Sequence, residues 1–176
     1  MTGRFEVFEA KAGSTLGPAD FRRALATFPA GVVVVTATEA NGRPVGLTVS
    51  AFCSVSAEPP LVLVCVDKGS NTLPAILDSG MFTVNILNSD SEDLALLFAS
   101  KTEEKFTEVI WHMPRALDGG GPILHSDAAS YLVCTVDQAI EAGDHWVMIG
   151  AVREAAVHEA PRPLVYHQRT FFTVSG

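Results

Sequence analysis

The feature that most restricts the fold is the run Gly-Val-Val-Val-Val-Thr-Ala-Thr at residues 31–38. Branching at Cβ favours extended backbone, and Asn41-Gly42 follows where a hairpin turn belongs. Similar stretches recur along the chain, most of them separated by turn-forming residues. Further strands are expected at residues 45–49, 51–56, 61–66, 81–87, 130–139, 146–158 and 164–174. The pattern therefore predicts a mostly β protein.

Helical pattern is scarce by comparison. Helices are expected over residues 21–28, 71–79 and 91–98, with caps at Asp20, at Ser70 and at Asp90 or Ser91. The second and third are too short to cross over parallel strands repeatedly, which disfavours a doubly wound sheet. An antiparallel closed barrel with a few short peripheral helices is the favoured architecture.

Length and charge restrict the domain count and the partners. The 176 residues fit one domain, and we expect a loosely ordered arm over residues 1–18 followed by a single domain over residues 19–176. The net charge of -8 disfavours nucleic acid and anionic membranes as partners. No apolar run approaches the roughly 20 residues that span a bilayer, and the start of the chain lacks a leader pattern. We therefore expect a cytoplasmic protein.

The cysteine spacing and the absence of common motifs exclude several kinds of site. Cys53, Cys65 and Cys134 are widely spaced and odd in number, so neither a disulfide framework nor a metal site is expected, and buried thiols in strands are the simpler interpretation. The dinucleotide-binding glycine fingerprint, the P-loop and the common hydrolase motifs are absent. The glycine-rich residues 119–122 are interpreted as a plain loop.

Two polar segments are candidates for ligand binding. In the first, Gly46 would let the backbone approach a flat ligand closely, and Thr48 and Ser50 lie on one face of an extended chain. Hydroxyls in a strand also commonly face solvent, so this segment alone leaves both interpretations open.

The second segment is a polar turn after the apolar strand at residues 61–66. Free N–H groups at the following helix start, with Ser70, Asn71 and Thr72 and with Lys68 nearby, could bind a phosphate. Ordinary helix capping by Ser70 is the alternative.

These segments, read with several later ones, resemble the short-chain flavin reductase family. The matching stretches are residues 44–72, 81–87, 98–101, 105–106, 143–146 and 163–166, in the family's order. The resemblance implies an FMN-binding split barrel that forms a homodimer. It also implies an NAD(P)H:flavin oxidoreductase, which transfers a hydride from NADH or NADPH to FMN or FAD and supplies reduced flavin to a separate monooxygenase. Hydride transfer between two cofactors needs no acid, base or nucleophile from the protein, so binding residues are expected instead of a catalytic triad.

The resemblance also implies the site residues. Gly46 to Thr48 with Ser50 and Ala51 would line the flavin ring, residues 65–67 would lie along it, Asn71 and Thr72 would meet the phosphate end, and Lys101 would supply charge there. The implied flavin residues are Gly46, Leu47, Thr48, Ser50, Ala51, Cys65, Val66, Asp67, Asn71, Thr72, Phe98, Ser100 and Lys101. Those implied for the nicotinamide dinucleotide are Gly143, Asp144, His145 and Trp146, with His145 positioning the nicotinamide.

One segment departs from the family pattern. Residues 166–171 read Tyr-His-Gln-Arg-Thr-Phe, with Arg169 where relatives often have glycine. Arg169 either faces water or meets a dinucleotide phosphate. Two other functions stay open: a flavin-binding electron-transfer or sensing protein without reductase turnover, and a pyridoxamine-oxidase-like enzyme. Residues 143–145 favour the reductase over the first, and the absence of a recognisable arginine cluster for a substrate phosphate disfavours the second.

Overall fold

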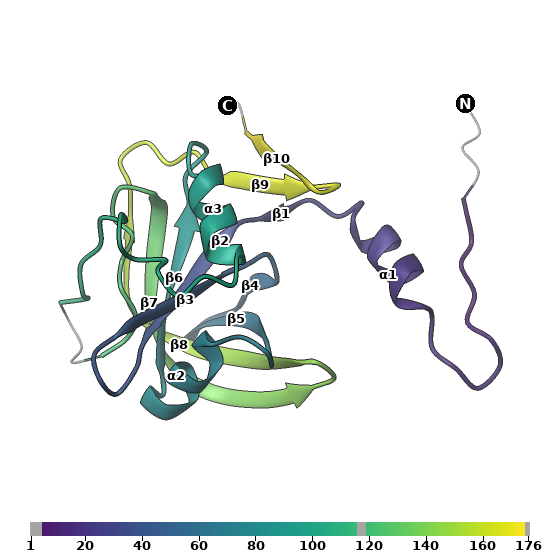
Figure 1. Cartoon of the computed structure of the whole chain (residues 1–176), viewed down its shortest axis with the longest axis horizontal. Coiled ribbons are helices and arrows are strands. Elements are labelled where there is room, and N and C mark those ends of the chain that lie inside the picture. Colours follow the sequence, from purple (N-terminus) through teal and green to yellow (C-terminus); the bar gives the residue numbers. More distant parts are fainter. Residues whose placement is uncertain (1–4, 116–118, 175–176) are drawn as a thin grey trace.

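The computed structural model describes residues 5–115 and 119–174, and residues 1–4 of the expected arm, 116–118 and 175–176 lie outside it. In the described part, seven antiparallel strands form the main sheet in the order β3-β2-β6-β7-β8-β5-β4 (Figure 1). These strands are β2 (Val33–Thr38), β3 (Pro44–Val49), β4 (Phe52–Ala57), β5 (Pro60–Asp67), β6 (Met81–Leu87), β7 (Ala128–Ala142) and β8 (His145–Val157).

The chain itself forces this sheet to curl. Strands β3 and β4 lie at opposite ends of the strand order, yet only Ser50 and Ala51 separate them in sequence. The two edges must therefore meet, and the N–H of Cys65 donates to the carbonyl of Ala51 at 3.0 Å beside the junction. The predicted antiparallel barrel is confirmed.

A small second sheet corrects one expectation. It contains β1 (Ala30–Gly31), β9 (Leu164–His167) and β10 (Thr170–Thr173), so residues 164–174 form a hairpin and not the single strand predicted. The turn lies at Gln168 and Arg169, whose φ values are 49° and 65°. Residues other than glycine rarely adopt this left-handed region, which is why the segment resembles an uninterrupted strand in sequence. Packing of the Tyr166 and Phe171 rings, 5.1 Å apart between centroids, holds the hairpin together.

The helices lie near their predicted positions, and the second ends at Ser79 as predicted, but the other ends differ by one to three residues. The helices are α1 (Pro18–Leu25), α2 (Thr72–Ser79) and α3 (Glu92–Ala99). Helix α1 begins at Pro18 with Gly17 at its N-cap position, and not after Asp20, because the fixed φ of proline suits a first helical position. Ser91 precedes α3 but does not cap it, since its hydroxyl donates to the carbonyl of Asp127 at 3.1 Å.

Burial on both faces of β2 explains its unbroken valine run. Val33 and Val35 pack in the barrel interior with Phe82, whereas Val32 and Val34 pack against α3 and β9 in a second cluster. All four valines are at most 2% exposed. A strand covered on both sides has no solvent face and so shows no alternation of polar and apolar residues.

The glycine-rich segment is a loop, as expected, but it is a buried one. Residues 120–124 are buried, and polar side chains of β6 bind their backbone. Thr83 Oγ1 donates to the carbonyl of Gly121 at 2.8 Å, and Asn85 Oδ1 accepts from the N–H of Leu124 at 2.9 Å. A Cβ on Gly121 would lie 2.0 Å from the backbone carbon of Thr36, so only glycine fits there. Residues 119–124 therefore pack against β2 and are hydrogen-bonded to β6.

The start of the described chain extends away from the barrel. Figure 1 shows α1 and the preceding segment set apart from both sheets, and none of the α1 residues is buried. Arg23 pairs with Glu6 at 2.6 Å, which joins this segment to α1. Over the part of the chain that the structure describes, no helix is long and apolar enough to cross a membrane.

Candidate functional site

One cleft of about 450 Å³ gathers most of the predicted flavin residues. Its walls come from β3, from the turn between β5 and α2, and from the segment at residues 98–106 that ends α3 and follows it. The predicted residues that line it are Gly46, Leu47, Thr48, Asp67, Asn71, Thr72, Phe98, Ser100 and Lys101. Segments far apart in sequence thus meet at one surface, as the resemblance requires.

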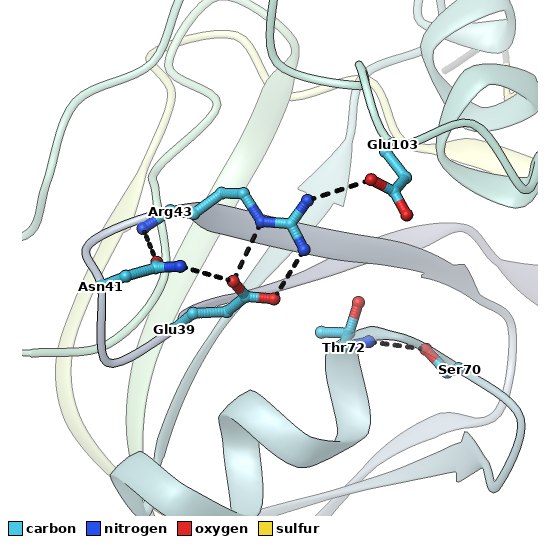
Figure 2. A network of polar contacts seen from close by, with 6 residues as sticks. All are labelled: Glu39, Asn41, Arg43, Ser70, Thr72 and Glu103. Atoms are coloured by element: carbon cyan, nitrogen blue, oxygen red, sulfur yellow. Dashed lines mark hydrogen bonds and ion pairs between the residues drawn. The ribbon is translucent and has the colours of Figure 1, made fainter.

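The start of α2 offers the Thr72 hydroxyl to this cleft, but not the free N–H groups that were expected. The N–H of Leu73 already bonds to the carbonyl of Ser70 at 3.3 Å, and Pro74 has no N–H. Ser70 Oγ accepts from the N–H of Thr72 at 3.1 Å, but the N-cap position belongs to Asn71, which has no side-chain cap bond. The expected cap at Ser70 is therefore one residue too early. Thr72 is only 2% exposed, and Figure 2 shows its hydroxyl directed away from α2 toward β3. No hydrogen bond to Thr72 Oγ1 is found among residues 5–115 and 119–174. Since no unpartnered side-chain oxygen of the described residues is buried, the Thr72 hydroxyl reaches the cleft surface, where it could bond a phosphate oxygen.

Two lysines line the cleft in different ways. Lys105 Nζ donates to the carbonyls of Phe98 at 2.8 Å and Gly46 at 3.1 Å, and burial holds its pKa below the usual value. Lys101 is exposed and lies in the same lining. Lys105 lies in one of the stretches that carry the resemblance but is not among the implied site residues, because nothing in its local sequence marks it as buried.

Two predicted hydroxyls are already engaged. Thr48 Oγ1 donates to the carbonyl of Ala95 at 2.6 Å, and Ser100 Oγ donates to the carbonyl of Leu97 at 2.7 Å. Each hydroxyl has a single proton, so in this arrangement both oxygens can only accept from a ligand. Thr48 therefore joins β3 to α3, which the alternation of residues along β3 does not reveal.

Gly46 has a packing role in addition to the expected close approach to a ligand. A Cβ at this position would lie 2.8 Å from Cε1 of Phe98 and 3.1 Å from the carbonyl oxygen of Val35. The ring of Phe98 thus occupies the space that the missing side chain leaves. The ring is also 5.0 Å from that of Phe106 in an edge-to-face arrangement, which forms one end of the cleft.

Four predicted flavin residues do not line the cleft. Val66 is 0% exposed, and its side chain packs in the barrel interior. Cys65 is half-buried, and burial raises the pKa of its thiol. Ser50 and Ala51 are exposed at the link between β3 and β4.

The cysteines differ in burial. Cys134 is buried as expected, but Cys53 is exposed, so the expectation of three buried thiols is wrong. Strand β4 lies at the edge of the main sheet, where its residues have a strand on only one side.

The predicted nicotinamide residues lie beside the cleft and not in its lining. Gly143, with φ 60°, and Asp144 form the two-residue turn between β7 and β8, an arrangement that requires glycine at its first position. The N–H of Lys68 donates to the carbonyl of Asp144 at 3.0 Å, and His145 is paired with Asp67 across the strands. Asp67 lines the cleft, so this turn and the cleft share an edge.

The imidazole of His145 is held by its neighbour. Its Nδ1 lies 2.8 Å from Oδ1 of Asp144, and this hydrogen bond lowers the pKa of the Asp144 carboxyl. The side chain of His145 is 41% exposed, and the hydrogen bond to Asp144 uses only Nδ1. Trp146 is half-buried and packs against the barrel interior opposite Val66.

Sequence reasoning missed Arg43. Its guanidinium lines the cleft and bonds to Glu39 through Nε at 2.9 Å and Nη2 at 2.8 Å (Figure 2). These bonds lower the pKa of Glu39 and raise that of Arg43. An arginine beside a hairpin turn is common, so the sequence does not mark Arg43 as a site residue. Only the folded chain shows that it lines a cleft. In the described residues, no group of three or more His, Cys, Asp or Glu side chains could hold a metal ion.

Several known proteins are similar to this chain over most of its length. A flavin reductase (NADH) from Kitasatospora aureofaciens is 40% identical over 152 residues, which is 86% of this chain and 78% of the relative. The reductase subunit HsaB of a flavin-dependent monooxygenase from Mycobacterium tuberculosis is 38% identical over 155 residues, 87% of this chain and 80% of that protein.

A solved structure shares the fold. The NADH:FAD oxidoreductase SgcE6 from Streptomyces globisporus, in complex with NAD and FAD fragments, has a TM-score of 0.82 and 30% identity. The match covers 89% of this chain and 92% of that one. Residues 25–175 also match the flavin reductase like domain. The chain therefore belongs to the flavin reductase family, with its split-barrel fold.

Proposed function

We propose that the protein is an NAD(P)H:flavin oxidoreductase, which transfers a hydride from NADH or NADPH to FMN or FAD. The observation that carries the proposal is the shared edge between two predicted sites. Nine of the predicted flavin residues line the cleft. The turn at Gly143 and Asp144 lies beside the cleft, because His145, which follows the turn, pairs with Asp67 in the cleft lining. A flavin ring and a nicotinamide could therefore occupy adjacent positions.

The start of α2 supports the placement of the flavin phosphate. Thr72 offers a hydroxyl with no other partner among the described residues, Asn71 is exposed beside it, and Lys101 lines the same cleft. Convergent donors at a helix start bind a dianionic phosphate at little reorganisation cost. Riboflavin lacks this phosphate, so FMN is expected to bind more tightly than riboflavin.

Protein side chains have a positioning role in this proposal. Flavin and nicotinamide supply the reactive bonds when both are bound. Asp144 fixes one nitrogen of His145 and leaves Nε2 for the nicotinamide side. Close and fixed orientation of two reacting groups lowers the activation barrier by about 7–11 kcal/mol in well-oriented intramolecular reactions.

The test is nicotinamide oxidation by the purified protein with and without added flavin. NADH and NADPH are each combined with FMN, FAD and riboflavin, and absorbance of the reduced nicotinamide is followed. Oxidation should require flavin and exceed the rate with free flavin alone. Tight flavin binding without such oxidation would instead favour an electron-transfer or sensing protein on the same barrel.

We also propose that the protein is a homodimer. On α1 and just after it, Phe21, Leu25 and Phe28 are 54%, 55% and 73% exposed, at spacings that place them on one side. A second copy of the chain would cover these residues, since no segment of the described chain does. Sedimentation at micromolar concentration should give a dimer, and Leu25→Ser should weaken it. A wild-type monomer would contradict this proposal.

A separate flavin-dependent monooxygenase is the proposed recipient of the reduced flavin. The relative named a monooxygenase reductase subunit supports this partner, because it matches over most of both chains. Coupled product formation by a monooxygenase supplied only with NADH, flavin and this protein would test the transfer. The expected location in the cytoplasm stays a prediction.

A further inference from the structure

The hairpin between β2 and β3 holds the Arg43 side chain in one orientation. Glu39 binds two nitrogens, Nε and Nη2, along one edge of the guanidinium, and Asn41 Nδ2 donates to the same carboxylate at 3.3 Å. Asn41 Oδ1 in turn accepts from the N–H of Arg43 at 2.8 Å. The loop thus fixes the guanidinium before any ligand arrives, as Figure 2 shows.

One nitrogen of Arg43 faces away from this loop. Nη1 lies 3.4 Å from Oε2 of Glu103, in the segment that forms the opposite wall of the cleft. The side chains of Arg43 and Glu103 are 45% and 70% exposed. A long and exposed ion pair contributes little to stability, so another anion can replace Glu103 at small cost. Glu103 therefore occupies a position suited to a ligand anion.

Burial distinguishes this position from the start of α2. Thr72 is almost fully buried, whereas Arg43 lies at the solvent side of the same cleft. A ligand with one phosphate at Thr72 would end inside the cleft. A ligand with a second phosphate would continue outward, and Arg43 is the arginine in the cleft lining that could meet it.

We propose that Arg43 binds the second phosphate of FAD in exchange for Glu103, and that this pair makes the cleft selective for FAD over FMN. The inference rests on the proposed flavin reductase function. Glu39 stays bound throughout the exchange, so its carboxylate orients the guanidinium while Nη1 meets the phosphate oxygen. The exchange replaces a long, exposed ion pair with Glu103 by a hydrogen bond of ordinary length to a phosphate oxygen.

Equilibrium titration of riboflavin, FMN and FAD, followed by flavin fluorescence, tests this exchange. Arg43→Met should weaken FAD binding about tenfold and change FMN and riboflavin binding less than about twofold. Glu103→Gln should tighten FAD binding about threefold, because the competing carboxylate is removed. The effect of Glu103→Gln should vanish in the double variant. Glu104→Gln removes the same charge from the next residue, outside the cleft lining, and should change nothing.

Several outcomes would overturn the inference. Equal weakening of FMN and FAD by Arg43→Met would place Arg43 on the first phosphate. Weakened NAD⁺ binding with unchanged FAD binding would assign it to the nicotinamide dinucleotide. Unchanged FAD affinity in Glu103→Gln, an exposed substitution that should leave the fold intact, would exclude the exchange. A wild-type protein that binds none of the three flavins would instead reject the proposed function itself.

Discussion

Replacing Gly46 by alanine tests the packing of α3 against β3 at one end of the cleft. The new Cβ would lie 2.8 Å from Cε1 of Phe98, closer than carbon atoms pack, and 3.1 Å from the carbonyl oxygen of Val35. That carbonyl belongs to the paired strand β2 and cannot move away, so the ring of Phe98 must shift. Phe98 is 1% exposed and packed against Phe106. Overpacking a closed site of this kind typically costs about 1–3 kcal/mol.

Urea denaturation of the purified variant measures this cost in the free energy of unfolding. Gly31→Ala is the matched control, because a Cβ at Gly31 would meet no atom within 4 Å and its backbone is not left-handed. The control should be neutral or stabilised by about 0.4–1 kcal/mol, since alanine restricts the unfolded chain. A similar m-value in both variants would show that the unfolding transition is unchanged.

A double-mutant cycle identifies Phe98 as the source of the strain. Phe98→Leu alone should destabilise by creating space, and in combination with Gly46→Ala the new methyl group should occupy part of that space. We expect a coupling free energy of at least about 1 kcal/mol. Additivity of the two substitutions within about 0.5 kcal/mol would refute the reasoning. If stability recovers in the double variant but flavin affinity does not, Gly46 also contacts the ligand.

Four further predictions concern separate parts of the molecule. His145→Ala should lower kcat/KM for NADH by about tenfold or more, because an orienting contact is lost, while the flavin dissociation constant changes by less than about twofold; equal losses of both would reject its assignment to the nicotinamide. Asn85→Ala should lower the free energy of unfolding, measured in urea, by about 1–3 kcal/mol, since the buried N–H of Leu124 loses its acceptor. Arg169→Gly should raise the free energy of unfolding by about 0.5–1 kcal/mol, because glycine tolerates the φ of 65°, and a lower melting temperature would contradict this. Burial raises the pKa of the Cys134 thiol to about 12. The stabilisation by the buried neutral thiol is therefore complete below about pH 9 and is lost as the pH rises toward 12. Above about pH 9 the difference in free energy of unfolding between the wild type and Cys134→Ala should fall by about 1.4 kcal/mol per pH unit.

The elements of this protein could be predicted from local pattern. The valine run, the glycine turns at Gly42 and Gly143 and the polar turn after β5 are each determined by the φ and ψ preferences of a few neighbouring residues. The hairpin at Gln168 and Arg169 escaped prediction for the same reason. Local preference disfavours its left-handed backbone, and contacts between β9 and β10 override it.

Only some of the predicted flavin residues line the cleft. Strand alternation directs Val66 into the barrel interior, although its neighbour Asp67 lines the cleft. Thr48 was expected to offer its hydroxyl to a ligand, but α3 supplies an acceptor from a position 47 residues away in the chain. A polar residue in sequence therefore indicates a candidate donor and does not show whether that donor is free.

The sequence by itself determined the strands, the approximate helices and the order of segments by which the family is known, because backbone preference and family motifs are properties of short stretches. The tertiary structure alone decided which groups surround the cleft. Arg43 and Glu103 are 60 residues apart, and the glycine-rich residues 119–124 are held by side chains of β2 and β6. Such contacts depend on how the barrel closes, and barrel closure is a property of the whole chain that short stretches of sequence do not encode.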